Sequence, residues 1–101
     1  MQTVYSQEQI VRTKNIAKII GDMSNVLILY ELMNFGEKSF NELKRMTDIN
    51  AVTLSKKLTL LKAEGLVASR ECGIENHYFV TDRSEEYRPL IRDIERIIIN
   101  K

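Results

Sequence analysis

The sequence predicts a mainly α-helical protein with one small β-hairpin, an α+β fold. Apolar residues recur at spacings of three and four through most of the chain, which is typical of amphipathic helices. Each glycine stands where one of these periodic segments stops. Only residues 66–81 change to the β-branched and aromatic composition of a hairpin. The length of 101 residues and the even composition predict one domain over residues 1–101.

Two helices are predicted at the N-terminal end. The first spans residues 6–21 and begins with a capping-box pattern, in which Ser6 is followed three residues later by Gln9. The second spans residues 25–34, with Ser24 as its expected N-cap. This second helix is apolar nearly all round its circumference, so we expect it at the centre of the core.

Residues 39–64 predict two further helices joined by a tight turn. The first is short and begins with a second capping-box pattern at Ser39. The second spans residues 51–64, and Asn50 is its expected N-cap. Three leucines at four- and three-residue spacing form its inward face: Leu54, Leu58 and Leu61.

A hairpin is predicted over residues 66–81, with turn residues at 73–76. The last helix spans residues 89–100 and begins at Pro89, because proline is favoured at the first position of a helix. A short helix, a tight turn, a second helix and then a hairpin is the order of a winged helix-turn-helix. In the helix-turn-helix, the second helix of the pair enters the major groove of DNA.

The outward face of helix 51–64 predicts contact with double-stranded DNA. Opposite the leucines its side chains are small, hydrogen-bonding or basic, and no carboxylate lies near its N-terminus. The expected contacts on this helix are Val52, Thr53, Ser55, Lys56, Lys57 and Thr59. Further contacts are expected from the preceding helix and from the hairpin, at Lys44, Arg70, Asn76 and His77. The alternative interpretation is that these side chains only form a solvated surface.

The distribution of charge supports DNA binding more than the total charge does. The formal net charge is only +1. Residues 38–70, however, hold seven basic and three acidic side chains, and the segments on both sides of them are net negative. A positive middle third favours a polyanionic partner, although a lysine-rich solvated surface would have the same composition.

An apolar stripe on the last helix predicts a homodimer. The preceding helices and hairpin already supply a core, and little of the chain remains to cover this stripe. The N- and C-terminal helices, residues 6–21 and 89–100, are therefore expected to form the dimer interface. Its expected residues are Ile10, Ala17, Ile20, Leu90, Ile91, Ile94, Ile97 and Ile98. The alternative is that the stripe packs within the core of its own chain.

Several segments resemble the HxlR-type winged-helix transcriptional regulators, a branch close to the MarR and ArsR types. Residues 20–32, IGDMSNVLILYEL, are similar to the IGGKWTLLILREL of that family. The other matching segments are FNEL at 40–43, LSKKL at 54–58, EGLV at 64–67 and YFVT at 78–81. The resemblance implies a homodimer that binds a near-palindromic operator and regulates transcription, with repression as the expected mode.

The chain departs from the family pattern in two places. Ser24 stands where the family has a tryptophan, so the packing beside the second helix must differ. The cysteine that many members carry ahead of the first matching segment is missing, and Thr13 and Lys14 lie in that region. A redox sensor of that kind is therefore not expected.

The sequence does not indicate other classes of function. One cysteine and one histidine argue against a disulfide framework and against a metal site of the usual cysteine and histidine kind. No catalytic constellation is visible, so we expect neither enzyme activity nor a cofactor. The lack of a long apolar run and of a signal pattern predicts a cytoplasmic protein that does not bind membranes. The alternative function is a winged-helix module that binds another protein.

Overall fold

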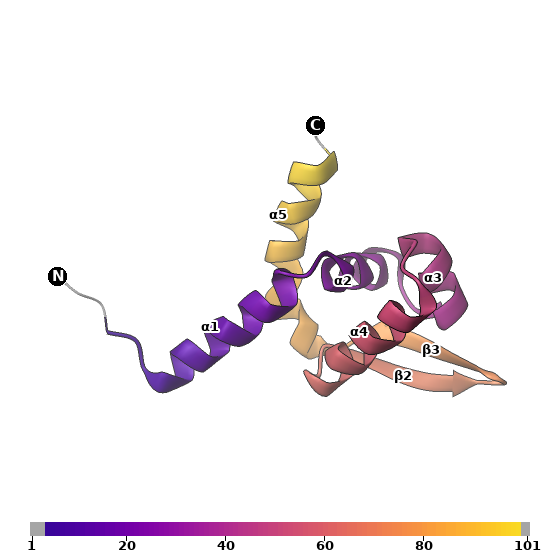
Figure 1. Ribbon diagram of the computed structural model, residues 1–101, viewed down its shortest axis with the longest axis horizontal. Coiled ribbons are helices and arrows are strands. Elements are labelled where there is room, and N and C mark those ends of the chain that lie inside the picture. The colour runs from indigo at the N-terminus through magenta and orange to yellow at the C-terminus, as the bar shows by residue number, and fades with distance from the viewer. Residues whose placement is uncertain (1–3, 100–101) are drawn as a thin grey trace.

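The computed structural model describes residues 4–99, and their side chains up to residue 97 (Figure 1). The elements follow in the order α1 (Gln7–Ile20), α2 (Met23–Phe35), β1 (Lys38–Ser39), α3 (Phe40–Thr47), α4 (Ala51–Ala63), β2 (Val67–Cys72), β3 (Glu75–Val80), the 3-10 helix η1 (Asp82–Tyr87) and α5 (Arg88–Ile99). This order confirms the predicted α+β class and the winged helix-turn-helix arrangement. Among the described residues, no helix is long and apolar enough to cross a membrane.

The starts of α1, α3 and α4 follow the capping signals, whereas α2 begins earlier than predicted and α5 begins at Arg88, one residue before Pro89. The Ser6–Gln9 capping box is present, and Ser6 Oγ accepts a hydrogen bond from the Gln9 N–H at 3.1 Å. Helix α2 begins earlier than predicted, because Asp22 rather than Ser24 is its N-cap. Asp22 Oδ1 accepts a hydrogen bond from the Ser24 N–H at 2.9 Å. A carboxylate at this place also interacts favourably with the partial positive charge of the helix N-terminus.

Helices α3 and α4 form the predicted helix-turn-helix. Ser39 caps α3 in a capping box with Glu42, and Asn50 caps α4 by accepting a hydrogen bond from the Thr53 N–H at 2.9 Å. Asp48 ends α3 in the left-handed conformation with a φ of 57°, which aspartate adopts more readily than most residues. This conformation lets the chain change direction sharply before α4 begins.

The wing is a three-stranded antiparallel sheet in the order β1-β3-β2. Cys72 pairs with Glu75, so the hairpin loop contains only Gly73 and Ile74, whereas the sequence predicts a longer turn over residues 73–76. Gly73 has a φ of 66°, which glycine adopts at no steric cost. The sequence does not predict β1, because a strand of two residues is too short to show an alternating pattern.

The core lies between α2, the helix-turn-helix and the inner face of the sheet. Its buried hydrophobic residues are Ile19, Val26, Ile28, Leu29, Leu32, Leu43, Ile49, Leu54, Leu58, Leu61, Leu66, Val67, Tyr87 and Ile91. The leucines of α4 point inward as predicted, since Leu54, Leu58 and Leu61 are at most 2% exposed. Their burial fixes the rotation of α4 about its axis and leaves the opposite face of that helix on the surface.

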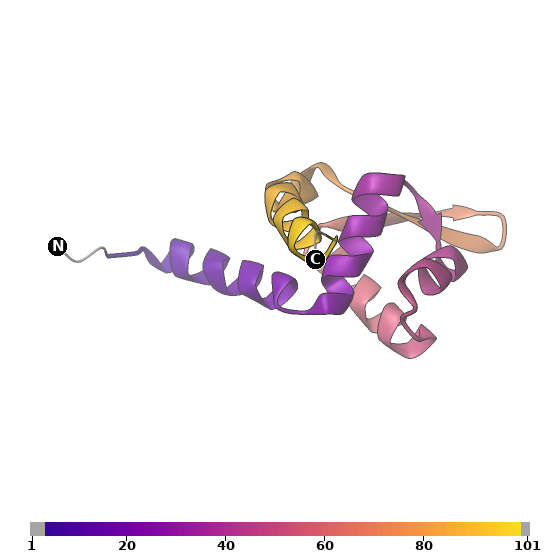
Figure 2. The same cartoon turned by 90° about the horizontal axis from the view of Figure 1, so that it is seen from above.

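Helices α1 and α5 project from this body. The projection of α1 is visible in Figures 1 and 2, and that of α5 is clearest in Figure 1. Ile91 of α5 is 2% exposed and packs in the core of its own chain, which corrects the expectation that it lies at the dimer interface. Ile20 and Ile94 are partly buried against the same core. The exposed members of the predicted interface are Ile10, Ala17, Leu90 and Ile97. The side chain of Ile98 lies outside the described residues.

Candidate nucleic-acid interface

The outward face of α4 is open to solvent near the helix N-terminus. Val52 is 66% exposed, and the side chains of Ser55 and Lys56 are exposed beside it. Thr59 continues this surface one turn further along the helix, whereas Thr53 is half-buried. An apolar group, a hydroxyl and an ammonium group therefore share one surface. These are the kinds of group that contact a thymine methyl, base edges and phosphates in the major groove.

Two of the predicted contacts on α4 already take part in hydrogen bonds of the helix. The Thr59 hydroxyl donates to the Ser55 carbonyl oxygen at 2.9 Å, so only its oxygen lone pairs remain for a ligand. The Thr53 N–H is bound by the Asn50 side chain at the helix N-terminus. The remaining free N–H groups and the helix dipole still favour a phosphate near this end of α4.

Lys57 differs from the other predicted contacts on α4. Its Nζ lies 2.6 Å from Asp22 Oδ2, and its side chain is only 27% exposed. The hydrogen bond from Lys57 holds the pKa of the Asp22 carboxyl below its ordinary value, with the N–H of Ser24 as a further cause. Lys57 therefore connects α4 to the N-terminus of α2, which makes it less accessible to a phosphate than the other predicted contacts on α4.

Two predicted contacts in the wing are bound to a residue that the sequence analysis did not single out, Glu37. Arg70 donates to both Glu37 oxygens, from Nε at 3.0 Å and from Nη2 at 2.8 Å. His77 Nδ1 lies 3.1 Å from Glu37 Oε2. The bond from Arg70 is the main cause that lowers the pKa of Glu37. Glu37 is separated in sequence from the β2–β3 hairpin by α3 and α4, so no local pattern could have revealed this partner.

The register of the hairpin places its side chains on two opposite faces, because side chains alternate along a strand. Arg70 is paired with His77, so both lie on one face. Glu71 is paired with Asn76, and these two share the other face with Ser69. The hydroxyl of Ser69 accepts a hydrogen bond from Lys62 Nζ of α4 at 2.8 Å, which identifies this second face as the one on the side of α4. Asn76 therefore lies on the face nearer α4.

The last turn of α3 adds positive charge to the helix-turn-helix. Lys44 and Arg45 are both exposed there. Lys44 is the predicted contact, and Arg45 next to it is equally accessible. Basic residues in the turn that precedes a DNA-reading helix are placed to contact phosphates.

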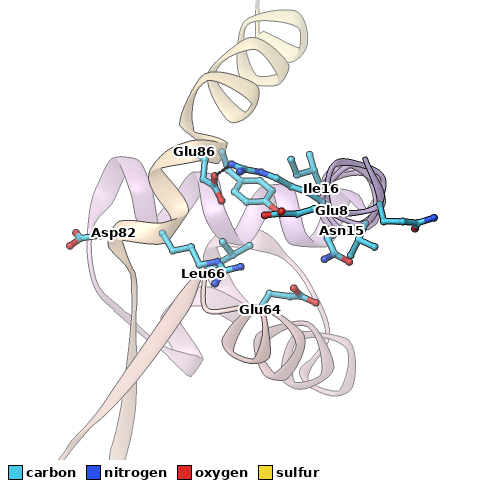
Figure 3. Close-up of a pocket in the computed structure, with 12 residues that line it drawn as sticks. Glu8, Asn15, Ile16, Glu64, Leu66, Asp82 and Glu86 are labelled. Atoms are coloured by element: carbon cyan, nitrogen blue, oxygen red, sulfur yellow. Dashed lines mark hydrogen bonds and ion pairs between the residues drawn. The ribbon is translucent and has the colours of Figure 1, made fainter. Parts of the chain in front are cut away.

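A groove of about 840 Å³ lies between α1 and the body of the molecule (Figure 3). Glu8, Asn15 and Ile16 of α1 line one side of it, and Leu66 and Glu86 lie across from them. Arg12 of α1 forms an ion pair with Glu86 of η1 across the groove. No sequence pattern indicates this groove, because it arises only from the way α1 stands away from the body.

Most of the chain matches one known protein family. Residues 19–100 match the model described as HxlR-like helix-turn-helix. The chain belongs to the HxlR-like helix-turn-helix family. This membership confirms the resemblance noted in the sequence and places the chain among transcriptional regulators rather than enzymes. Among curated protein sequences, none matches it.

Solved structures share the fold of this HxlR-like protein along almost its whole length. The transcriptional repressor BigR from Xylella fastidiosa is 22% identical with a TM-score of 0.77, and the match covers 92% of this chain and 91% of BigR. The redox regulator HypR in its oxidized form is 20% identical with a TM-score of 0.80, over 89% of this chain and 96% of HypR. HlyU from Vibrio cholerae is 20% identical with a TM-score of 0.75, over 95% of this chain and all of HlyU. At sequence identities this low, the similarity shows a shared fold and nothing more.

Proposed function

We propose that this chain binds double-stranded DNA in a sequence-specific manner, as a homodimer, and represses transcription from the bound site in the cytoplasm. The observation that carries the proposal is the outward face of α4, where Val52, Ser55 and Lys56 are exposed opposite three buried leucines. The proposed DNA contacts are Val52, Thr53, Ser55, Lys56 and Thr59 of α4, Lys44 of α3 and Asn76 of the wing. Family membership and the repressor BigR among its structural neighbours support the proposal.

The chemistry of these residues indicates which part of the DNA each of them contacts. Lys56 is placed to contact a phosphate or the acceptor atoms of a guanine, and Ser55 can donate to or accept from any base edge. Val52 offers methyl groups to the methyl group of a thymine. Lys44 approaches the DNA backbone and adds affinity without adding sequence information.

The exposed apolar residues of α1 and α5 support a homodimer. Ile10 is 37% exposed, Leu90 39% and Ile97 69%, and these residues lie on the two helices that project from the body. A two-fold interface would cover them with the same residues of a second copy. Such a dimer would present two copies of α4 to half-sites about one helical turn apart.

The proposal is tested by selecting bound duplexes from a random pool. We expect a two-fold symmetric motif whose half-sites lie about 10.5 base pairs apart, centre to centre. Failure to retain any duplex, even at low salt, would contradict the proposal and favour a module that binds another protein.

The role of α4 is tested with Lys56→Glu on the selected duplex. We expect binding to weaken by roughly tenfold or more, because a phosphate or guanine contact is replaced by repulsion. Arg92→Glu is the matched control: it makes the same charge change at an exposed residue of α5, away from α4 and about 160° round the helix from Leu90. Equal affinity of the two variants would show that α4 does not read the DNA.

A further inference from the structure

Three side chains of metal-ligating types meet on one face of the wing, toward the turn of the hairpin: Glu37, Cys72 and His77. Their ligand atoms all lie within 4.8 Å of one another, and all three residues are half-buried. His77 Nδ1 and Glu37 Oε2 are 3.1 Å apart. A free thiol, an imidazole nitrogen and a carboxylate oxygen thus face a common point.

The backbone of the wing holds these three residues in place. Cys72 pairs with Glu75 and Arg70 pairs with His77, so Cys72 and His77 lie on the same face of the hairpin in neighbouring rows. Glu37 directly precedes β1, which is hydrogen-bonded to β3 on its other edge. The ligand set therefore depends on the strand register and not on flexible loops alone.

We propose that Glu37, Cys72 and His77 bind one zinc-class divalent ion, through one Oε, Sγ and Nδ1 respectively. Sulfur, imidazole and carboxylate are the three ligand types that zinc takes from proteins, at bond lengths of about 2.0–2.3 Å. A tetrahedral site with those bonds needs ligand atoms roughly 3.3–3.6 Å apart. The three ligand atoms lie within 4.8 Å of one another, so side-chain rotations would have to bring them closer, and a water molecule would complete the fourth position.

The surroundings of the cluster provide the outer contacts that metal-bound histidines usually have. His77 Nε2 lies 3.8 Å from Glu75 Oε2, just beyond hydrogen-bond distance. With Nδ1 on the metal, a small movement of the Glu75 side chain would let it accept the second ring N–H. Arg70 donates to both Glu37 oxygens, from Nε to Oε1 at 3.0 Å and from Nη2 to Oε2 at 2.8 Å. A metal bound at Oε2 would replace the second of these bonds, and the bond to Oε1 would keep the carboxylate oriented. Two negative ligands, the Glu37 carboxylate and the Cys72 thiolate, balance the charge of a divalent ion.

Binding converts the Cys72 thiol to a thiolate and releases its proton to solvent, so the affinity falls as the pH is lowered. The bound ion would connect the segment before β1 to both strands of the hairpin. That segment leads directly into Ser39, the N-cap of α3, so the ion would also join the wing to the helix-turn-helix. The site does not depend on the proposed DNA contacts, and its test requires no DNA.

The site is tested by titrating the full chain with Co²⁺ under a non-coordinating reductant and recording the absorption spectrum. We expect saturation at one ion per chain, with the strong near-ultraviolet band of a cobalt–thiolate bond. The affinity for Zn²⁺ is then measured by competition with a chelating dye. Cys72→Ser should abolish the thiolate band, and His77→Asn should weaken Zn²⁺ binding by about tenfold or more. Glu75→Gln, which removes only the outer contact of the histidine, should weaken it by about tenfold.

Glu71→Gln is the matched control, because Glu71 lies on the opposite face of the same strand. It should leave the Co²⁺ spectrum and the Zn²⁺ affinity unchanged. Far-ultraviolet circular dichroism of each variant checks that the fold is retained, and His77→Asn provides a second readout if Cys72→Ser does not fold. A wild-type chain without the thiolate band, or equal Zn²⁺ affinity of the wild type and the folded ligand variants, would overturn the proposal.

Discussion

The ion pair between Lys57 and Asp22 connects the helix proposed to read DNA to the N-terminus of α2. It lowers the pKa of Asp22 from the ordinary value of 3.8. Because the pKa in the folded chain lies below that in the unfolded chain, the stabilisation is present at neutral pH. It is lost in acid, as the pH falls below 3.8 and through the folded-state pKa.

We expect Asp22→Asn to lower the free energy of unfolding by about 1 kcal/mol at pH 7. Asparagine is as good an N-cap as aspartate, so this change removes the charge and keeps the cap. Urea unfolding at pH 7 and in strong acid measures the difference, which should shrink in acid. Asp93→Asn is the control, since Asp93 is 65% exposed and lies in a loose pair with Arg96. A loss of the same size at both pH values would attribute the effect to the cap rather than the charge.

Some features of single residues can be predicted from sequence patterns, and others cannot. The outward position of Val52 and Lys56 follows from the spacing of the leucines in the same helix, so it could be predicted. The partners of Lys57 and Arg70 could not be predicted, because Asp22 and Glu37 lie in other elements. Periodicity fixes the direction of a side chain, whereas the group that it meets depends on tertiary packing.

Among the elements, the wing carries a charge that opposes its expected contact with DNA. Glu71 lies on the face nearer α4, beside Asn76. We expect Glu71→Gln to strengthen DNA binding by roughly threefold at low salt, and by less as added salt screens the phosphates. Arg70→Gln should change the affinity little, because Arg70 is held by Glu37 on the other face. Fluorescence anisotropy at two salt concentrations measures both. A drop in affinity for Glu71→Gln would show that the wing is oriented differently on DNA.

The helices were easier to predict than the wing. Capping boxes at Ser6 and Ser39 mark where α1 and α3 begin, since each pattern satisfies free N–H groups locally. Strand β1 and helix η1 have no such local signal. Strand β1 exists because β3 offers it a hydrogen-bonding edge, which is a property of the assembled fold.

For the whole molecule, α5 carries two apolar surfaces with different roles. Ile91 faces the core, and Ile97 is 69% exposed on a different side of the helix. The sequence shows one wide stripe, and only the packing of α5 against α2 divides it. This division allows dimer formation and folding to be tested separately.

We expect Ile97→Asp to convert the dimer into a folded monomer, because it places a charge in the proposed interface. Ile91→Ala should instead lower the free energy of unfolding by about 2–4 kcal/mol, because it leaves a cavity in the core. Analytical ultracentrifugation and chemical unfolding measure the two effects. A wild-type chain that sediments as a monomer at high concentration would contradict the proposed homodimer.

The joint between α1 and α2 is tight. A β-carbon on Gly21 would lie 2.7 Å from the Ala17 carbonyl oxygen, so a larger residue there would require the backbone at this joint to shift. The next residue, Asp22, is the one that Lys57 of α4 binds. The direction of α1 and the position of α4, the helix proposed to read DNA, thus depend on two adjacent residues, Gly21 and Asp22. If α1 and α5 form the proposed dimer interface, a backbone shift at Gly21 would alter the separation of the two α4 helices. It would thereby alter the operator spacing that the two helices can match.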